Sequence, residues 1–147
     1  MDSVSCKQNR RLIFSTTKIN QNNISKEEVV LKNPALLAYI EGEFKILLDG
    51  EIFLEDDYMC VLELGVQLST WLNRKDDFYY DALSSEDKSI LKFISINEME
   101  YTISSSWSKL KTFSIAKEEL FEAVNSYIEH TDVLLKKHFN IKISDFM

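Results

Sequence analysis

The stretch from Ala35 to Leu72, ALLAYIEGEFKILLDGEIFLEDDYMCVLELGVQLSTWL, decides the fold of this chain. Between Ile40 and Leu48, apolar residues alternate with charged ones, which is the period-2 pattern of a strand with one buried face. The Asp49-Gly50 pair that follows suits a two-residue turn with positive φ at both central positions. Ile52 and Leu54 continue the alternation on the far side of the turn. The sequence therefore predicts a β-hairpin.

A helix is predicted directly after this hairpin. Asp56 or Asp57 is expected to cap it, because short acidic side chains accept hydrogen bonds from the first backbone N–H groups of a helix. The apolar residues then recur at spacings of three and four, which places them on one helical face: Val61, Leu64, Leu68, Trp71 and Leu72. The hairpin thus supplies a sheet and the helix covers one face of it.

The chain before this stretch is predicted to add one strand and one short element. Residues Met1 to Arg10 are polar and expected to be flexible, and Arg11 to Ile19 is rich in β-branched residues, which favours a strand. Ile24 to Lys32 is either a short helix capped by Ser25, with Glu28 completing a capping box, or a further strand.

The chain after this stretch is predicted to form a loop, a second hairpin and a long helix. Asn73 to Lys88 is expected to be an acidic and aromatic loop. Ile90 to Ile96 and Met99 to Trp107 read as the second hairpin, and Leu110 to Ile115 as a possible sixth strand. The last helix, capped by Ser114, is expected over Ala116 to Phe139, with a short strand or tail after it.

Together these elements predict a single α+β domain over residues 1–147. Its mainly antiparallel sheet has five to six strands, and the two long helices pack on one face of that sheet. The expected order of elements, with consecutive strands in pairs, favours hairpins over right-handed parallel crossovers.

Net charge narrows the classes of partner. The chain carries a formal charge of −7, and residues 51–100 hold twelve acidic side chains against four basic ones. A concentrated negative field repels nucleic acid and anionic lipid and attracts basic proteins, so neither a nucleic acid nor a membrane is expected as a partner. The acids could equally serve only to keep the protein in solution. The absence of a long apolar run or a signal sequence predicts a cytoplasmic protein.

The sequence predicts no catalytic, cofactor or metal site. His130 and His138 are too far apart on one helix to share a zinc ion, and the acidic runs lack the spacing of a calcium loop. Cys60 has no histidine nearby and is interpreted as a small apolar filler. Glu63 and Asp56 could in principle form a carboxylate pair, but in so acidic a segment such pairs arise by chance. We therefore expect a protein that is not an enzyme.

Two acidic and aromatic segments are the candidate binding surface. Carboxylates pair with lysine and arginine, and tyrosine gives a large contact area at a low entropic cost. The competing interpretation is that Phe78 and Tyr79 close the edge of the core beneath a solvated loop. The candidate residues are Glu55, Asp56, Asp57, Asp76, Asp77, Tyr79, Tyr80 and Asp81.

Three segments of the chain resemble a group of small bacterial immunity proteins. The segments are EGEFKILLDGEIFLEDDYMCVLELGVQLSTWL, DFYYDAL and WSKLKTFSIAKEELFEAVNSYIE, which together span roughly residues 35–130. Proteins of that group neutralise the toxin domains of contact-dependent growth inhibition and other polymorphic toxin systems. The resemblance implies a cytoplasmic protein without enzymatic activity that binds one cognate toxin, often a basic nuclease. The basic, asparagine-rich leader before residue 35 departs from the pattern.

Two other functions remain open at this point. A pocket between sheet and helix, lined by Tyr39, Trp71, Tyr101 and Trp107, would indicate a small-molecule-binding or enzymatic domain. A self-associating module using the last helix is the third possibility, although a monomer or weak dimer is expected.

Overall fold

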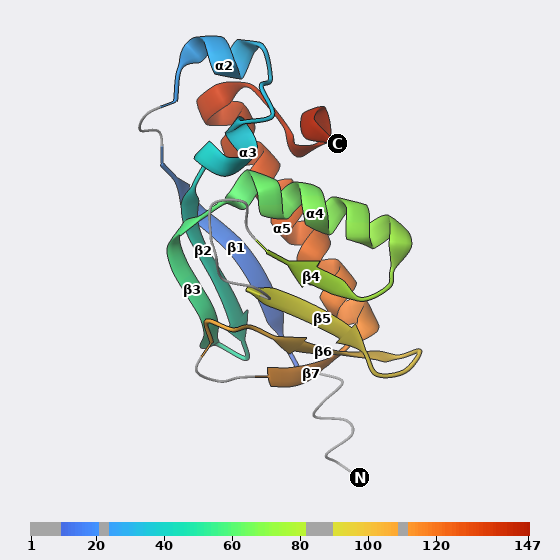
Figure 1. Ribbon diagram of the computed structural model, residues 1–147. Helices are drawn as coiled ribbons and strands as arrows, with labels where there is room; N and C mark the ends of the chain where they lie inside the picture. Colours follow the sequence, from blue (N-terminus) through green and yellow to red (C-terminus); the bar gives the residue numbers. More distant parts are fainter. Residues whose placement is uncertain (1–9, 21–23, 82–89, 109–111) are drawn as a thin grey trace.

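The computed structural model describes residues 10–20, 24–81, 90–108 and 112–147, and Figure 1 shows how their elements are arranged. Those residues form an α+β fold with two antiparallel sheets and two long helices. In chain order the elements are β1 (Leu12–Ile19), α2 (Lys26–Val30), α3 (Leu36–Tyr39), β2 (Gly42–Leu48), β3 (Glu51–Met59), α4 (Val61–Arg74), β4 (Phe78–Tyr80), β5 (Leu91–Ser95), β6 (Glu100–Ser104), β7 (Thr112–Ala116), α5 (Lys117–Phe139) and the 3-10 helix η1 (Ile143–Phe146).

The first sheet contains the predicted hairpin. Its order is β1-β2-β3, with Ile46 opposite Leu54 across the hairpin and Phe14 opposite Ile46 on the other side. The turn has φ values of 52° at Asp49 and 86° at Gly50, as a two-residue hairpin turn requires. The predicted strand 11–19 and the hairpin are therefore confirmed.

The second sheet contains β4-β5-β6-β7 in that order, so the expectation of one sheet of five to six strands needs correction. Residues 78–80, expected in a loop, form the edge strand β4 and pair with β5, where Phe78 lies opposite Phe93. The predicted loop beyond Asp81, from residue 82 to 88, lies outside the described residues, as do residues 1–9. Hairpin patterns are local, so they do not reveal whether two hairpins join one sheet or form two.

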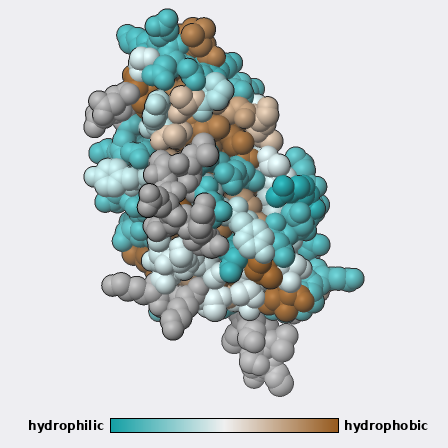
Figure 2. All heavy atoms as spheres, viewed as in Figure 1, coloured by the Kyte–Doolittle hydropathy of each residue, from teal (hydrophilic) through white to brown (hydrophobic). Residues whose placement is uncertain are grey.

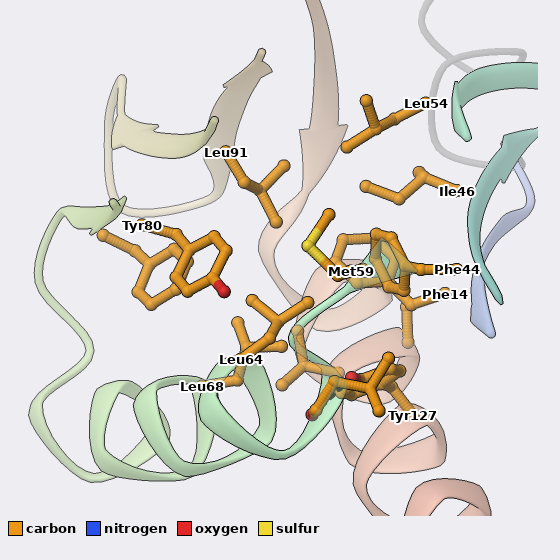
Figure 3. Packing of buried hydrophobic residues seen from close by; sticks show 14 of the residues in the cluster. Phe14, Phe44, Ile46, Leu54, Met59, Leu64, Leu68, Tyr80, Leu91 and Tyr127 are labelled. Atoms are coloured by element: carbon orange, nitrogen blue, oxygen red, sulfur yellow. Dashed lines mark hydrogen bonds between the residues drawn. The ribbon is translucent and has the colours of Figure 1, made fainter. Parts of the chain in front are cut away.

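The two sheets and the two helices enclose one core (Figure 3). The inner faces of the sheets meet where the rings of Phe14 and Phe93 lie 6.0 Å apart. Helix α5 packs against the first sheet through Tyr127, whose ring centroid is 5.5 Å from that of Phe44. The Tyr127 hydroxyl also donates to the carbonyl of Val61, 2.8 Å away, and so ties α5 to the first turn of α4.

Two predicted helix caps are wrong for one reason. Asp56 and Asp57 belong to β3, which continues to Met59, and Cys60 takes the N-cap position of α4. Ser114 likewise belongs to β7, and the N-cap of α5 is Ala116. In both places the strand runs directly into the helix, so the polar residue nearest the helix is part of the sheet.

The remaining short elements gather at one end of the molecule (Figure 1). Ser25 caps α2 as predicted for the helical alternative, because its Oγ accepts a hydrogen bond of 3.1 Å from the backbone N–H of Glu28. Lys32, just after α2, forms an ion pair of 3.5 Å with Asp145 of η1. This pair joins the two short elements. Within the described residues, no helix has both the length and the apolar character to cross a membrane.

A close approach of β1 and β2 at Gly42 gives a test of the first sheet. A Cβ added at Gly42 would lie 2.5 Å from the carbonyl oxygen of Lys18, a backbone atom in a paired strand. Gly42→Ala should therefore lower the free energy of unfolding by about 2 kcal/mol, measured by urea denaturation.

The control for this substitution is Gly50→Asn. Gly50 has nothing within 4 Å of its added Cβ, and asparagine tolerates a positive φ. We expect a loss of less than about 1 kcal/mol. Equal losses at both positions would contradict the close approach of the strands.

Candidate functional site

The first group of candidate residues lies on β3, one of the two outer strands of the first sheet. Glu55 and Asp57 are exposed, and Asp56 is half-buried. Glu55 forms an ion pair of 3.6 Å with Lys45, its cross-strand neighbour on β2. Exposed pairs of this kind contribute little to stability, so Glu55 can exchange this partner for another at small cost.

Asp56 differs from its two neighbours because part of its carboxylate is removed from water. Burial raises the pKa of Asp56, and the negative charge of Asp57 acts in the same direction. Hydrogen bonds from the backbone N–H groups of Tyr58 and Asp57 lower the pKa of Asp56 and only partly offset the burial. The charged form of the Asp56 carboxyl group is therefore less stable in the folded protein than in water.

Tyr58 is the residue of this group that the sequence interpretation missed. Tyr58 follows directly after Glu55, Asp56 and Asp57, and its side chain is 67% exposed. The pairing of β3 with β2 shifts register between Asp56 and Met59, so side chains do not alternate strictly there, and Asp57 and Tyr58 are both exposed. Simple alternation in the sequence therefore gives no signal that finds Tyr58.

The second group lies where α4 turns into β4. Lys75 adopts a left-handed conformation with φ of 58°, which ends α4. The indole Nε1 of Trp71 donates to the carbonyl of Asp76 at 2.6 Å, and the Tyr101 hydroxyl donates to the carbonyl of Lys75 at 3.0 Å. The Asp77 carboxylate accepts a hydrogen bond of 2.9 Å from the backbone N–H of Ser95. These three bonds fix the backbone of residues 75–77.

From this fixed backbone, several side chains of the second group reach the surface. Asp76 is exposed and forms an ion pair of 3.4 Å with Arg74. Tyr79 is 55% exposed on the outer face of β4, and Asp81 is exposed at its end. Tyr79 lies opposite Lys92 of β5. The competing interpretation holds for Phe78, which is buried, and does not hold for Tyr79.

Tyr80 is the one candidate that the structure removes from the surface. Its side chain is buried, and its hydroxyl donates to the carboxylate of Glu63, also buried, at 2.9 Å. Burial and the nearby Glu63 charge raise the pKa of Tyr80, so it stays protonated. Figure 3 shows its hydroxyl pointing toward α4. Because side chains alternate along a strand, Tyr79 and Tyr80 cannot both face outward.

The two groups therefore lie on outer strands of two different sheets, β3 in one and β4 in the other. Each group combines exposed carboxylates with one exposed tyrosine, Tyr58 or Tyr79. In Figure 2, hydrophilic side chains gather along the margin of the molecule where β3 runs in Figure 1. The acids expected as one surface thus form two separate acidic strips.

The four rings proposed for a small-molecule pocket differ in burial. Trp71 and Tyr101 are buried, and their centroids lie 5.7 Å apart in the core. Tyr39 and Trp107 are exposed. Among the described residues, no group of three histidine, cysteine, aspartate or glutamate side chains is placed to hold a metal ion.

Comparison with known proteins assigns the chain to a family without assigning an activity. Residues 12–137, which run from the start of β1 to near the end of α5, match the model of a family described as a domain of unknown function, DUF7878. Neither a curated protein nor a solved structure matches the chain.

The hydrogen bond between Tyr101 and Lys75 gives a test of the fixed backbone at residues 75–77. Tyr101→Phe removes the donor and should lower the free energy of unfolding by about 1 kcal/mol. Hydrogen exchange should quicken at the amides of residues 75–77. Tyr79→Phe, which removes an exposed hydroxyl, is the control and should leave both quantities unchanged.

The half-buried Asp56 predicts a pH-dependent gain in stability. Because the folded-state pKa of Asp56 is raised, its contribution favours folding at low pH and is lost as the pH rises through that pKa. Asp56→Asn should therefore stabilise the fold near pH 7, and the gain should vanish below about pH 3.

The measurement is thermal unfolding across this pH range, with Glu122→Gln on the exposed side of α5 as the control. A gain from Asp56→Asn that is independent of pH would contradict the proposed cause.

Proposed function

We propose that this chain, which belongs to the DUF7878 family of unknown function, is an immunity protein that binds and neutralises a cognate bacterial toxin domain. In this proposal the toxin domain is a basic protein, most simply a nuclease. The observation that carries the proposal is the pairing of exposed carboxylates with one exposed tyrosine on an outer strand of each sheet.

Charge supports the basic character of the toxin. A nuclease uses lysine and arginine to bind phosphates, and carboxylates placed on an outer strand can occupy those same cations. Opposite fields also speed the encounter of two proteins. Of the ion pairs in the described part of the chain, two hold candidate carboxylates, Lys45–Glu55 and Arg74–Asp76, and both are at the surface.

The two tyrosines support a tight contact. An exposed tyrosine buries a large area on binding and loses few rotamers, so interfaces are enriched in this residue. Tyr58 and Tyr79 each stand on a strand paired with a neighbour, so their backbones are ordered before binding. Such order lowers the entropic cost of association.

In this proposal the protein acts by binding alone, in the cytoplasm, as a monomer or weak dimer. It carries out no reaction and binds neither nucleic acid nor a membrane. The buried Glu63 and Tyr80 then serve to join α4 to β4.

The experiment measures binding to the toxin domain encoded by the adjacent gene. Two double variants separate the strips: Glu55→Gln with Asp57→Asn on β3, and Asp76→Asn with Asp81→Asn beside β4. Neutralising the strip that contacts the toxin should weaken binding roughly tenfold and reduce its dependence on salt. Tyr58→Ala or Tyr79→Ala in that same strip should weaken binding roughly thirtyfold.

The matched control is Glu122→Gln with Glu129→Gln, which removes the same charge from exposed positions on α5. It should change the dissociation constant less than about twofold, since long-range effects between exposed charges are screened by salt. If both strip variants bind the toxin as tightly as the unchanged protein, neither strip belongs to the interface. If the protein does not bind the neighbouring toxin at all, the proposed function is refuted.

A further inference from the structure

A cleft lies where the β2–β3 turn approaches β7. Its volume is about 360 Å³, at the lower end of the range for small-ligand sites. The residues that give it chemical character are Arg10, Asp49, Glu51, Phe53 and Phe113. They come from the segment before β1, the hairpin turn, β3 and β7, so the cleft exists only because the two sheets meet here.

The cleft already holds one cationic side chain of the protein itself. The guanidinium of Arg10 lies over the ring of Phe113, 5.7 Å from its centroid. Its Nε is 3.2 Å from a carboxylate oxygen of Asp49, and its Nη1 donates to the carbonyl of Ser114 at 3.4 Å. An aromatic face combined with a carboxylate and a carbonyl oxygen is the environment that a guanidinium prefers.

The walls of the cleft are fixed before any partner arrives. The rings of Phe53 and Phe113 meet edge to face with centroids 4.8 Å apart, and Phe53 is buried. Asp49 also accepts a hydrogen bond of 2.8 Å from the backbone N–H of Arg11. This bond, together with Arg10, lowers the pKa of Asp49, so its carboxylate stays charged.

The charges that line the cleft indicate which kind of ligand can bind there. Arg10 balances only one of the two lining carboxylates, Asp49 and Glu51. Glu51 is exposed and forms no ion pair with any residue of the described ranges. The cleft therefore keeps a net negative charge beside an aromatic wall, which disfavours an anion and favours a second cation.

We propose that this cleft receives an arginine side chain of the basic toxin. This inference rests on the proposed function. Glu51 pairs with the incoming guanidinium, whose propyl chain lies against the phenylalanine rings. Glu51 opens β3, and Glu55 follows four residues later, about 13 Å along the strand. A partner that lies along β3 therefore reaches the cleft with a neighbouring part of its surface.

The test begins with a probe that needs no toxin. N-acetyl-arginine methylamide is titrated into the full-length protein and followed by amide NMR shifts. Saturable shifts at Glu51, Phe53 and Thr112 are expected. The citrulline analogue, which has the same shape without the charge, should bind at least fivefold more weakly. Equal binding of the two compounds, or shifts scattered away from the cleft, would overturn the proposal.

Two substitutions with opposite effects sharpen the test. Arg10→Met removes the resident cation, frees Asp49 and the Phe113 face, and should tighten binding of the arginine probe about fivefold. Glu51→Gln should weaken it about fivefold. Glu122→Gln is the control and should have no effect. Unchanged or weaker binding by a folded Arg10→Met variant would overturn the proposal.

The failure of this proposal differs from the failure of the proposed function. If the probe does not bind but the neighbouring toxin binds through a strip, only the assignment of the cleft is wrong. If the probe binds with the expected response to Arg10→Met but the neighbouring toxin does not bind, the cleft is an arginine-binding site and the immunity function is refuted.

Discussion

The contacts of the Trp71 indole hold the second sheet, the helices and the loop of the second acidic strip together. The ring is fully buried, and the rings of Phe78, Phe93, Tyr101 and Phe121 surround it with centroids 5.0 to 6.0 Å away. Those rings come from three strands and from α5, so one side chain of α4 fixes how the helices sit on the sheet. The same indole donates its only hydrogen bond to the Asp76 carbonyl. The loop that presents the strip is thereby attached to the centre of the core.

Sequence reasoning succeeded where the determining forces are local. The hairpin at Asp49-Gly50 needs only alternation and a turn that accepts positive φ, and α4 and α5 need only their apolar faces. The division into two sheets was missed because it depends on contacts such as Phe14 with Phe93, which are far apart in the chain. Tyr80 was expected at the surface because residues 73–88 were interpreted as a loop, and only the pairing of β4 with β5 shows that Tyr79 and Tyr80 point to opposite sides. Tyr58 was missed because a helix was expected directly after Asp56 and Asp57, whereas β3 continues to Met59.

The acids on β3 also bear on how an outer strand avoids the wrong partners. An outer strand presents backbone groups that a second copy could pair with, and like charges placed opposite one another disfavour that pairing. Irregular register near Ile46 and Leu47 disturbs the strand further, and the Ser108 hydroxyl donates to the Phe53 carbonyl on β3. These features act against self-association, yet they leave the carboxylates of Glu55 and Asp57 exposed. The charge that repels another copy of an acidic protein is the charge that attracts a basic one.

Two ion pairs of the acidic strips have the same form, and this form suits exchange of partners. Lys45 with Glu55 and Arg74 with Asp76 each join side chains at the surface, where such pairs contribute about 0 to 1 kcal/mol. In the proposed function, a cation of the toxin therefore replaces the chain's own cation at little cost, and the freed lysine or arginine returns to water. The internal pairs keep the carboxylates oriented before binding without competing strongly during it. Weak internal pairing thus leaves association sensitive to salt, whereas the buried contacts around Trp71 keep the surface in one shape.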